Sequence, residues 1–301
     1  MLGEACEQAG VPKGCINIIC GYGYDAGASL AAHQDIDHIV FTGSVMTGRS
    51  ILKAAAERIV PCIMELGGKS AAIAYPDADP KQVIGSSALG IFSHAGQVCS
   101  AQSRLVVHES IHDQIVDGLV TKAQSLSVGP AFDGHNLGPL ISASQLDKVE
   151  GYCVAGQQAG ATALTGGRRS DMLGHFMQPT IFTDASPNMT IAQEEIFGPV
   201  LTVIPFSERE DAIEIANGTD FGLCAGVYTR DLETAHWTAD RLSAGQVFIN
   251  EWFAGGIETP FGGTKRSGYG REKGAEALLN YVQTKNVAVK LGAGIGARPG
   301  G

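Results

Sequence analysis

Residues 71–82 read Ala71-Ala72-Ile73-Ala74-Tyr75-Pro76-Asp77-Ala78-Asp79-Pro80-Lys81-Gln82 and indicate how this chain folds. The apolar run at 71–75 predicts a short buried strand. Asp79 predicts a helix N-cap, with proline at the first helical position and glutamine three residues after the cap. We expect that helix to run to about His94. Because Arg104 to His108 reads as the next strand, this stretch predicts one β–α–β unit.

The same alternation of strands and helices extends along the chain on both sides of this unit. Further short strands are predicted at residues 15–20, 37–42, 59–65, 200–206, 227–228 and 246–250. Helices are predicted at residues 2–9, 44–56, 110 onward, 142 onward, 207–217 and 229–245. Ser142 and Ser207 suit the N-caps of two of them. Such alternation is typical of parallel sheets with crossover helices, so the sequence predicts an α/β fold.

Composition argues against several classes of partner. The 301 residues are 44% hydrophobic and 17% charged, which is typical of a folded globular protein. A net charge of −10 argues against a nucleic-acid partner, since phosphate backbones bind clustered lysine and arginine. No apolar run approaches the roughly 18 residues of a membrane span, and the N-terminus lacks the pattern of a signal peptide. We therefore expect neither a nucleic acid nor a membrane as partner.

The seven cysteines are scattered without a disulfide framework, which indicates free thiols and the cytoplasm. Cys99 differs from the others because it lies on the loop Ser93 to Ser100, among glycine and polar residues. A nucleophilic cysteine needs access, a lowered pKa and a nearby base or dipole. Taken alone, such a cysteine is more often an inert packing residue, which is our interpretation of Cys6, Cys15, Cys20, Cys62, Cys153 and Cys224.

Glu65 ends the apolar strand predicted at residues 59–65 and precedes a glycine turn. A carboxylate that faces a cavity there would have a raised pKa and could act as a base near neutral pH. The plain alternative is a solvated acid at the end of a strand.

A second feature is Phe41-Thr42-Gly43-Ser44, where a strand runs into a helix that continues through Gly48. Backbone N–H groups at a helix start bind anions such as a pyrophosphate, although this pattern is a weak signal taken alone. A metal site is not expected, because His94 and Cys99 lack the paired spacing of zinc ligands.

Taken together, these segments resemble the aldehyde dehydrogenase superfamily. The matching segments are Phe41 to Ser44, Glu65 to Ser70, Phe92 to Arg104, Glu194 to Val200 and Pro260 to Gly268. The resemblance runs in order from residue 1 to about residue 290. It implies a remainder of a Rossmann-type cofactor domain at 1–67, a parallel-sheet catalytic domain at 68–279 and an oligomerisation strand at 280–291. Residues 292–301 are expected to form a disordered tail.

The resemblance also implies roles for individual residues. Cys99 would be the nucleophile and Glu65 the general base. The cofactor residues would be Gly43, Ser44, Gly48, Leu66, Glu195 and Phe197. Asn250, Trp252 and Phe253 would line a substrate tunnel, with core packing as the alternative for the two aromatic residues.

The implied activity is oxidation of a small-molecule aldehyde to a carboxylic acid, with NAD or NADP as cofactor and NAD favoured. The Cys99 thiolate would form a thiohemiacetal and then a thioester, and Glu65 would activate water to release the acid. The implied partner is a second copy of the chain, joined through the C-terminal strand. Hydrolysis of an ester or thioester by Cys99 and Glu65 without a cofactor is a less favoured alternative.

The resemblance places Met1 in the middle of the family fold. The asparagine that completes the family's oxyanion hole, and the lysine that holds the cofactor ribose, would then lie outside this sequence. Two interpretations stay open. Either this sequence is part of a complete NAD(P)-dependent enzyme, or the chain is a truncated, catalytically incompetent homologue that pairs with full-length subunits.

Overall fold

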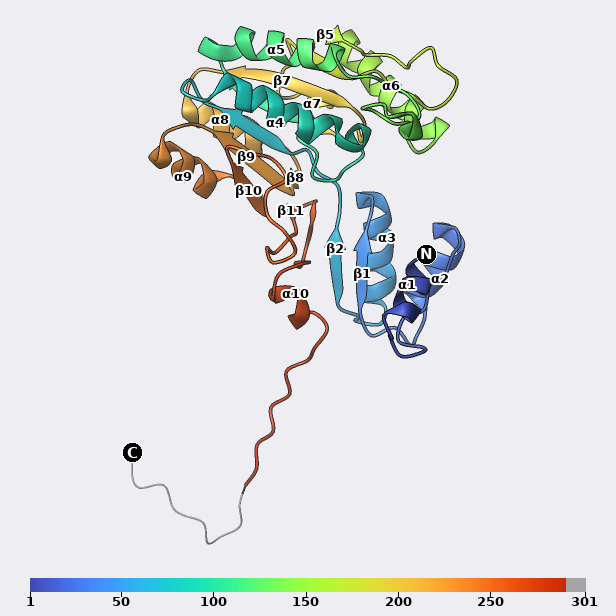
Figure 1. Cartoon of the computed structure of the whole chain (residues 1–301). Coiled ribbons are helices and arrows are strands. Elements are labelled where there is room, and N and C mark those ends of the chain that lie inside the picture. Colours follow the sequence, from blue (N-terminus) through green and yellow to red (C-terminus); the bar gives the residue numbers. More distant parts are fainter. Residues whose placement is uncertain (291–301) are drawn as a thin grey trace, which may run out of the picture.

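The computed structural model describes residues 1–290, and these are built on two main sheets (Figure 1). A seven-stranded sheet carries most of the chain. A three-stranded sheet holds N-terminal strands together with one short strand from near the C-terminus. Residues 291–301, which include the predicted tail 292–301, lie outside the described residues. The predicted α/β fold is confirmed.

The large sheet is mainly parallel. Its strands, in spatial order, are β10 (Gln246–Ile249), β9 (Cys224–Tyr228), β3 (Ala71–Ala74), β4 (Arg104–His108), β7 (Val200–Phe206), β6 (Thr180–Thr183) and β5 (Thr162–Thr165). Every neighbouring pair is parallel except β5 with β6. All four residues of β3 are buried, as expected for a parallel strand that is covered on both faces.

Helices cover both faces of this sheet. Alternate residues of β3 belong to different cores because successive side chains of a strand point to opposite faces. Ala72 and Ala74 pack with side chains of α4 (Pro80–Phe92) and α5 (His112–Gln124). Ala71 and Ile73 pack with α8 (Arg209–Asn217), and α9 (Leu232–Arg241) joins that face through a hydrogen bond of 2.8 Å between Tyr75 and Thr238.

Two of the predicted helix caps are present. Asp79 accepts a hydrogen bond from the Lys81 N–H at 3.0 Å at the start of α4. Ser142 accepts one from the Gln145 N–H at 3.2 Å at the start of α6 (Ala143–Gln158). The predicted cap at Ser207 is wrong, because α8 has Glu208 as N-cap and no side-chain cap. β7 stays paired up to Phe206, and α8 begins at Arg209. The N-cap position therefore falls one residue after Ser207.

The small sheet lies beside the large one (Figure 1). β1 (Ile39–Thr42) pairs in parallel with β2 (Cys62–Glu65), and the helix α3 (Val45–Ala56) connects them. β12 (Gly268–Tyr269) pairs antiparallel with β2. The division at residue 67 stays a prediction. However, β12 shows that residues assigned to the second domain also complete the first sheet.

The N-terminal segment contains α1 (Leu2–Gln8), a π-helix (Gly23–Gly27) and α2 (Ala28–Ala32). The strand predicted at residues 15–20 is wrong. Ile16, Ile18 and Ile19 are 51–66% exposed there, and no strand forms. A strand needs a neighbour to pair its N–H and C=O groups, and none of residues 1–290 takes that place.

The remaining elements are short. They are β8 (Phe221–Gly222) paired with β11 (Thr264–Lys265), α7 (Thr190–Gln193), α10 (Glu276–Leu279) and single 3₁₀ turns at Ser93–Gly96, Glu109–Ile111 and Ala131–Asp133. Residues 282–290 pair with no other strand within residues 1–290, so the oligomerisation strand at 280–291, which would pair with a second copy of the chain, stays a prediction. None of the helices within residues 1–290 is both long enough and apolar enough to cross a lipid bilayer.

Candidate active site

One cavity of about 540 Å³ brings together residues from the small sheet and from the main body. It is lined by Thr42, Gly43, Ser44, Glu65, Leu66, Gly67, Gln97, Val98, Cys99, Gln145, Lys148, Glu195 and Phe197. All the predicted catalytic and cofactor residues line it except Gly48. That glycine is buried in α3 against Leu66, where a Cβ would lie 2.8 Å from the leucine side chain.

The wall from the small sheet is the turn between β1 and α3. Ser44 is the N-cap of this 12-residue helix, and its hydroxyl accepts a hydrogen bond from the Thr47 N–H at 3.2 Å. The Gly43 N–H donates to the Glu65 carbonyl oxygen at 3.1 Å, which ties the turn to β2. The start of this helix therefore faces the cavity with N–H groups suited to an anion.

Glu65 ends β2 and is only 3% exposed. Neither carboxylate oxygen has a hydrogen-bond partner among the described residues. The pKa of Glu65 is raised to about 8, mainly by burial and also by the charge of Glu272, while the charge of Arg271 lowers it. The raised pKa agrees with the prediction made from its place at the end of the strand.

Cys99 lies half-buried on a turn that is held by a hydrogen bond of 3.0 Å from the Ala101 N–H to the Val98 carbonyl. The lowered pKa expected of a nucleophile is not found. Burial raises the pKa of the Cys99 thiol, and the charge of Glu195 adds to this. The N–H groups of Ser100 and of Cys99 itself lower it, and the charge of Glu65 raises it. Burial of the sulfur is thus the main cause of the raised pKa, and the nearby carboxylates of Glu195 and Glu65 add to it.

The loop that carries Cys99 has an unusual backbone. His94, Ala95 and Gly96 all have positive φ, at 50°, 53° and 72°. A Cβ on Gly96 would overlap the carbonyl group of Gly198. The loop that carries Cys99 is thus packed directly against the segment that carries Glu195.

Glu195 reaches the cavity from a loop far along the chain. Its Oε1 accepts a hydrogen bond from the Gly68 N–H at 3.0 Å, and a Cβ on Gly67 would overlap Oε2. Burial raises the pKa of this carboxyl group, against the Gly68 N–H and the charges of Lys148 and Lys69. A carboxylate held in this way can accept hydrogen bonds from the hydroxyls of a ribose.

Sequence reasoning missed Gln97, Gln145 and Lys148. Gln145 and Lys148 lie one turn apart on α6, so they share a face of that helix. The Gln145 amide donates to the Phe197 carbonyl oxygen at 2.8 Å. The Gln97 side chain accepts from the Ile141 N–H at 2.9 Å. Periodicity could indicate the shared face but not that it borders this cavity.

The three predicted tunnel residues are not among those that line the cavity. The Asn250 side chain is occupied by the Thr229 backbone, accepting from its N–H at 3.0 Å and donating to its carbonyl at 2.9 Å. Trp252 is buried, and its indole N–H donates to the Ser100 carbonyl at 3.0 Å. Phe253 packs against the main core. Trp252 thus stabilises the turn that carries Cys99 through its hydrogen bond to Ser100.

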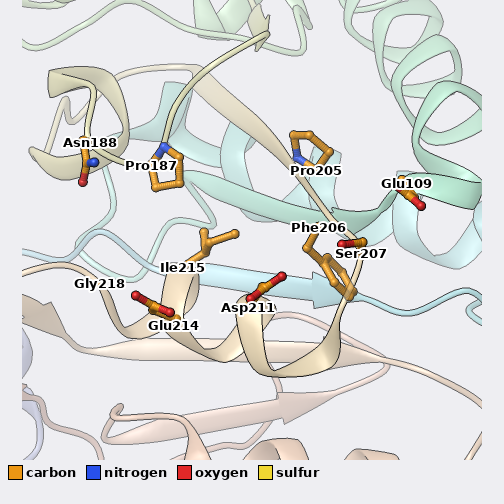
Figure 2. Close-up of a pocket in the computed structure, with 10 residues that line it drawn as sticks. All are labelled: Glu109, Pro187, Asn188, Pro205, Phe206, Ser207, Asp211, Glu214, Ile215 and Gly218. Atoms are coloured by element: carbon orange, nitrogen blue, oxygen red, sulfur yellow. The ribbon is translucent and has the colours of Figure 1, made fainter.

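A second cavity, of about 510 Å³, lies away from these residues (Figure 2). Its acidic members are Glu109, Asp211 and Glu214, and none of the predicted site residues lines it. Within residues 1–290, no group of three or more histidine, cysteine, aspartate or glutamate side chains is arranged to hold a metal ion.

The chain is similar to characterised proteins over nearly its whole length. Residues 1–287 match the model of the aldehyde dehydrogenase family. The chain is 46% identical over 288 residues to an aldehyde dehydrogenase of Emericella nidulans, covering 95% of this chain and 58% of that protein. It is 44% identical over 296 residues to a betaine aldehyde dehydrogenase of Brucella melitensis, covering 97% and 61%.

Comparison with solved structures supports the same family. The NAD+ complex of an aldehyde dehydrogenase from Bacillus cereus superimposes with a TM-score of 0.94 at 43% identity, covering 96% of this chain and 59% of that one. The chain therefore spans about three fifths of the length of these relatives. Family match, sequence identity and fold agree that this chain belongs to the aldehyde dehydrogenase family.

Proposed function

We propose that this chain carries the nucleophile and the general base of an NAD(P)-dependent oxidation of an aldehyde to a carboxylic acid. The observation that supports this most is the shared cavity, to which separate segments contribute Cys99, Glu65 and Glu195 beside the anion-binding turn at Gly43 and Ser44. The family membership of the chain supports the same reaction class.

In the proposed reaction the Cys99 thiol gives its proton to solvent water, and the thiolate sulfur adds to the aldehyde carbon. The N–H groups around the sulfur can help to hold the oxyanion of the resulting thiohemiacetal. Loss of hydride from that carbon leaves a thioester on Cys99. Glu65, which needs to be ionised for this step, accepts a proton from water as the water oxygen attacks the thioester carbon. The C–S bond then breaks, which releases the carboxylic acid and restores Cys99.

The residues around the cavity fit a dinucleotide. The start of α3 suits a pyrophosphate, and Glu195 with Lys148 can bind ribose hydroxyls. Leu66 and Phe197 supply apolar walls. A bound oxidised cofactor would supply the acceptor for the hydride. We favour NAD over NADP, and the NAD+ complex of the similar Bacillus cereus enzyme supports this choice.

We further propose that the substrate is a small-molecule aldehyde and that copies of the chain associate through residues 280–291 in the cytoplasm. The names of two relatives, the betaine aldehyde dehydrogenase of Brucella melitensis and the aminoaldehyde dehydrogenase 1 of Pisum sativum, are consistent with such a substrate. The net charge of −10 argues against a nucleic-acid partner.

The test is the formation of NAD(P)H by the purified 301-residue chain, with a short aliphatic aldehyde and each cofactor offered separately. We expect turnover that is abolished by Cys99→Ala and kept by Cys15→Ala, which alters an exposed cysteine outside the cavity. Persistent turnover in Cys99→Ala would exclude Cys99 as the nucleophile. A folded chain without turnover would favour the incompetent homologue that pairs with full-length subunits.

The role of Glu65 is tested separately. Glu65→Gln should let an acyl group accumulate on Cys99, which mass spectrometry of the intact protein detects, because water is no longer activated. Release of the acyl group at the normal rate would assign the base to another residue.

A further inference from the structure

Ser267 lies where the two sheets meet, and its hydroxyl is fully buried between them. It donates a hydrogen bond to the Gly67 carbonyl oxygen at 2.7 Å and accepts one from the Gly222 N–H at 3.0 Å. One hydroxyl therefore joins the glycine turn that follows β2 to the end of β8, 45 residues before Ser267 in the chain.

The backbone of Ser267 adds further contacts between the same segments. The Leu66 N–H donates to the Ser267 carbonyl oxygen at 2.9 Å. Gly268 follows and pairs with Glu65 in the antiparallel register of β12 and β2. Gly268 has φ of 111°, and a Cβ there would overlap the Met64 carbonyl. The end of β2 is thus held on one side by Ser267 and Gly268.

The segment around Ser267 also forms the wall beside the Glu65 carboxyl group. A Cβ on Gly262 would lie 2.7 Å from Glu65 Oε1, so the backbone of this segment closely covers that oxygen. Arg271 donates to the carbonyl oxygens of Gly263 and Gly270, at 3.0 and 2.6 Å, which folds residues 263–271 back on themselves. Burial of Glu65 therefore depends on where this segment sits.

We propose that Ser267 is a positioning residue for the Glu65 carboxyl group. Its hydroxyl would hold in place the turn after β2 and residues 262–272, here called the covering segment. The inference rests on the proposed role of Glu65 as general base. Ser267 itself does not line the cavity, so it would act only through the position and hydration of Glu65.

Several ionisable groups surround Glu65. Glu272 and Arg271 lie on the covering segment, while the thiols of Cys99 and Cys224 interact with its charge from the other elements. Moving the segment away weakens the opposing effects of Glu272 and Arg271 together. Hydration of the Glu65 carboxyl group then decides its pKa. This pKa should fall, because water stabilises the ionised form of a carboxyl group.

The test is an infrared pH titration of the protonated carboxyl band that is lost in Glu65→Gln, and it requires no turnover. We expect this band to titrate near pH 8 in the wild-type chain. Ser267→Ala should move the midpoint down by about one pH unit or more. Thr238→Val, which removes another fully buried hydroxyl with one hydrogen bond, should leave the midpoint unchanged. If Ser267→Ala does not fold, Ser267→Cys keeps the size and a weak donor and is measured in the same way.

Equal midpoints for the wild type and the Ser267 variant, with unchanged circular dichroism, would overturn the proposal. A titration midpoint of the wild-type band at the ordinary pKa of a glutamate would also overturn the proposal. Failure of the proposed function would show differently, as turnover that is absent or that survives Cys99→Ala, and it would leave the infrared result standing.

Discussion

Gly96 combines a left-handed backbone with a close approach of two chain segments. Its φ is 72°, and a side chain would overlap the Gly198 carbonyl. Gly96→Ala should therefore lower the free energy of unfolding by about 2 to 4 kcal/mol, because backbone strain and overpacking add. Urea denaturation followed by circular dichroism measures the change.

Gly151→Ala is the matched control for Gly96→Ala. Gly151 lies within α6 with open space around it, so alanine there should stabilise the chain by about 0.5 to 1 kcal/mol. Similar effects of the two substitutions would mean that contact with Gly198 does not restrict the loop.

Cys99 shows how neighbouring charges set reactivity. Since Glu195 and Glu65 both raise the pKa of the thiol, replacing either with glutamine should lower that pKa and speed alkylation at a given pH. Glu195→Gln should have the larger effect, because its charge is the stronger of the two influences. Iodoacetamide labelling across pH 6 to 10, read at the Cys99 peptide by mass spectrometry, tests this order.

Glu194→Gln serves as the control for this labelling. The Glu194 carboxylate accepts a hydrogen bond from the Tyr152 hydroxyl at 2.6 Å and is not among the influences on Cys99. Its variant should keep the wild-type profile. The prediction is wrong if Glu195→Gln leaves the profile in place or moves it to higher pH.

Among the helices, the two serines proposed as N-caps from the sequence differ in the structure. Ser142 accepts a hydrogen bond at the start of α6, whereas Ser207 caps nothing. Ser142→Ala should cost about 1 kcal/mol of stability, and Ser207→Ala should stay within about 0.5 kcal/mol of the wild type. Thermal and urea unfolding of the two variants measure the difference. Equal losses would show that the capping bond adds no net stability.

The C-terminal end of α8 is bound by two cations from other elements. Arg104, buried on β4, donates to the Ile215 and Ala216 carbonyl oxygens at 2.7 Å each. Lys265 on β11 donates to the Asn217 carbonyl oxygen at 2.7 Å. Carbonyl groups at a helix end lack partners within the helix and carry partial negative charge, which accounts for a buried arginine here.

At the scale of the whole molecule, the extended segment that follows α10 exposes apolar side chains. Val287 and Val289 are both 72% exposed, and in a strand they would share one face. If copies associate through this segment, Val287→Asp with Val289→Asp should shift the protein toward a smaller species. Size-exclusion chromatography with light scattering measures the mass.

The control places the same two charges on the other face, as Asn286→Asp with Ala288→Asp. This pair should disturb association less than the valine pair does. An unchanged mass in both double variants would contradict association through residues 280–291.

The strands and helices that the sequence predicted correctly are those whose signals are local. Asp79 and Ser142 cap helices by bonding to residues two or three positions away, and the β4 strand carries its own apolar run. The failure at residues 15–20 has another cause. A strand exists only when a neighbour pairs with it, and local apolar character does not say whether that neighbour is present.

The sequence by itself determined the α/β class, the family and the identity of the candidate groups, since periodicity and motif spacing are properties of the chain. Only the tertiary structure decided that Glu195 meets Gly68, 127 residues away, and that Cys99 shares their cavity. It also decided that burial and two carboxylates raise the pKa of the Cys99 thiol and that Asn250 is held by Thr229. The physical reason is that burial, electric field and side-chain partners arise from residues far apart in sequence that folding brings together.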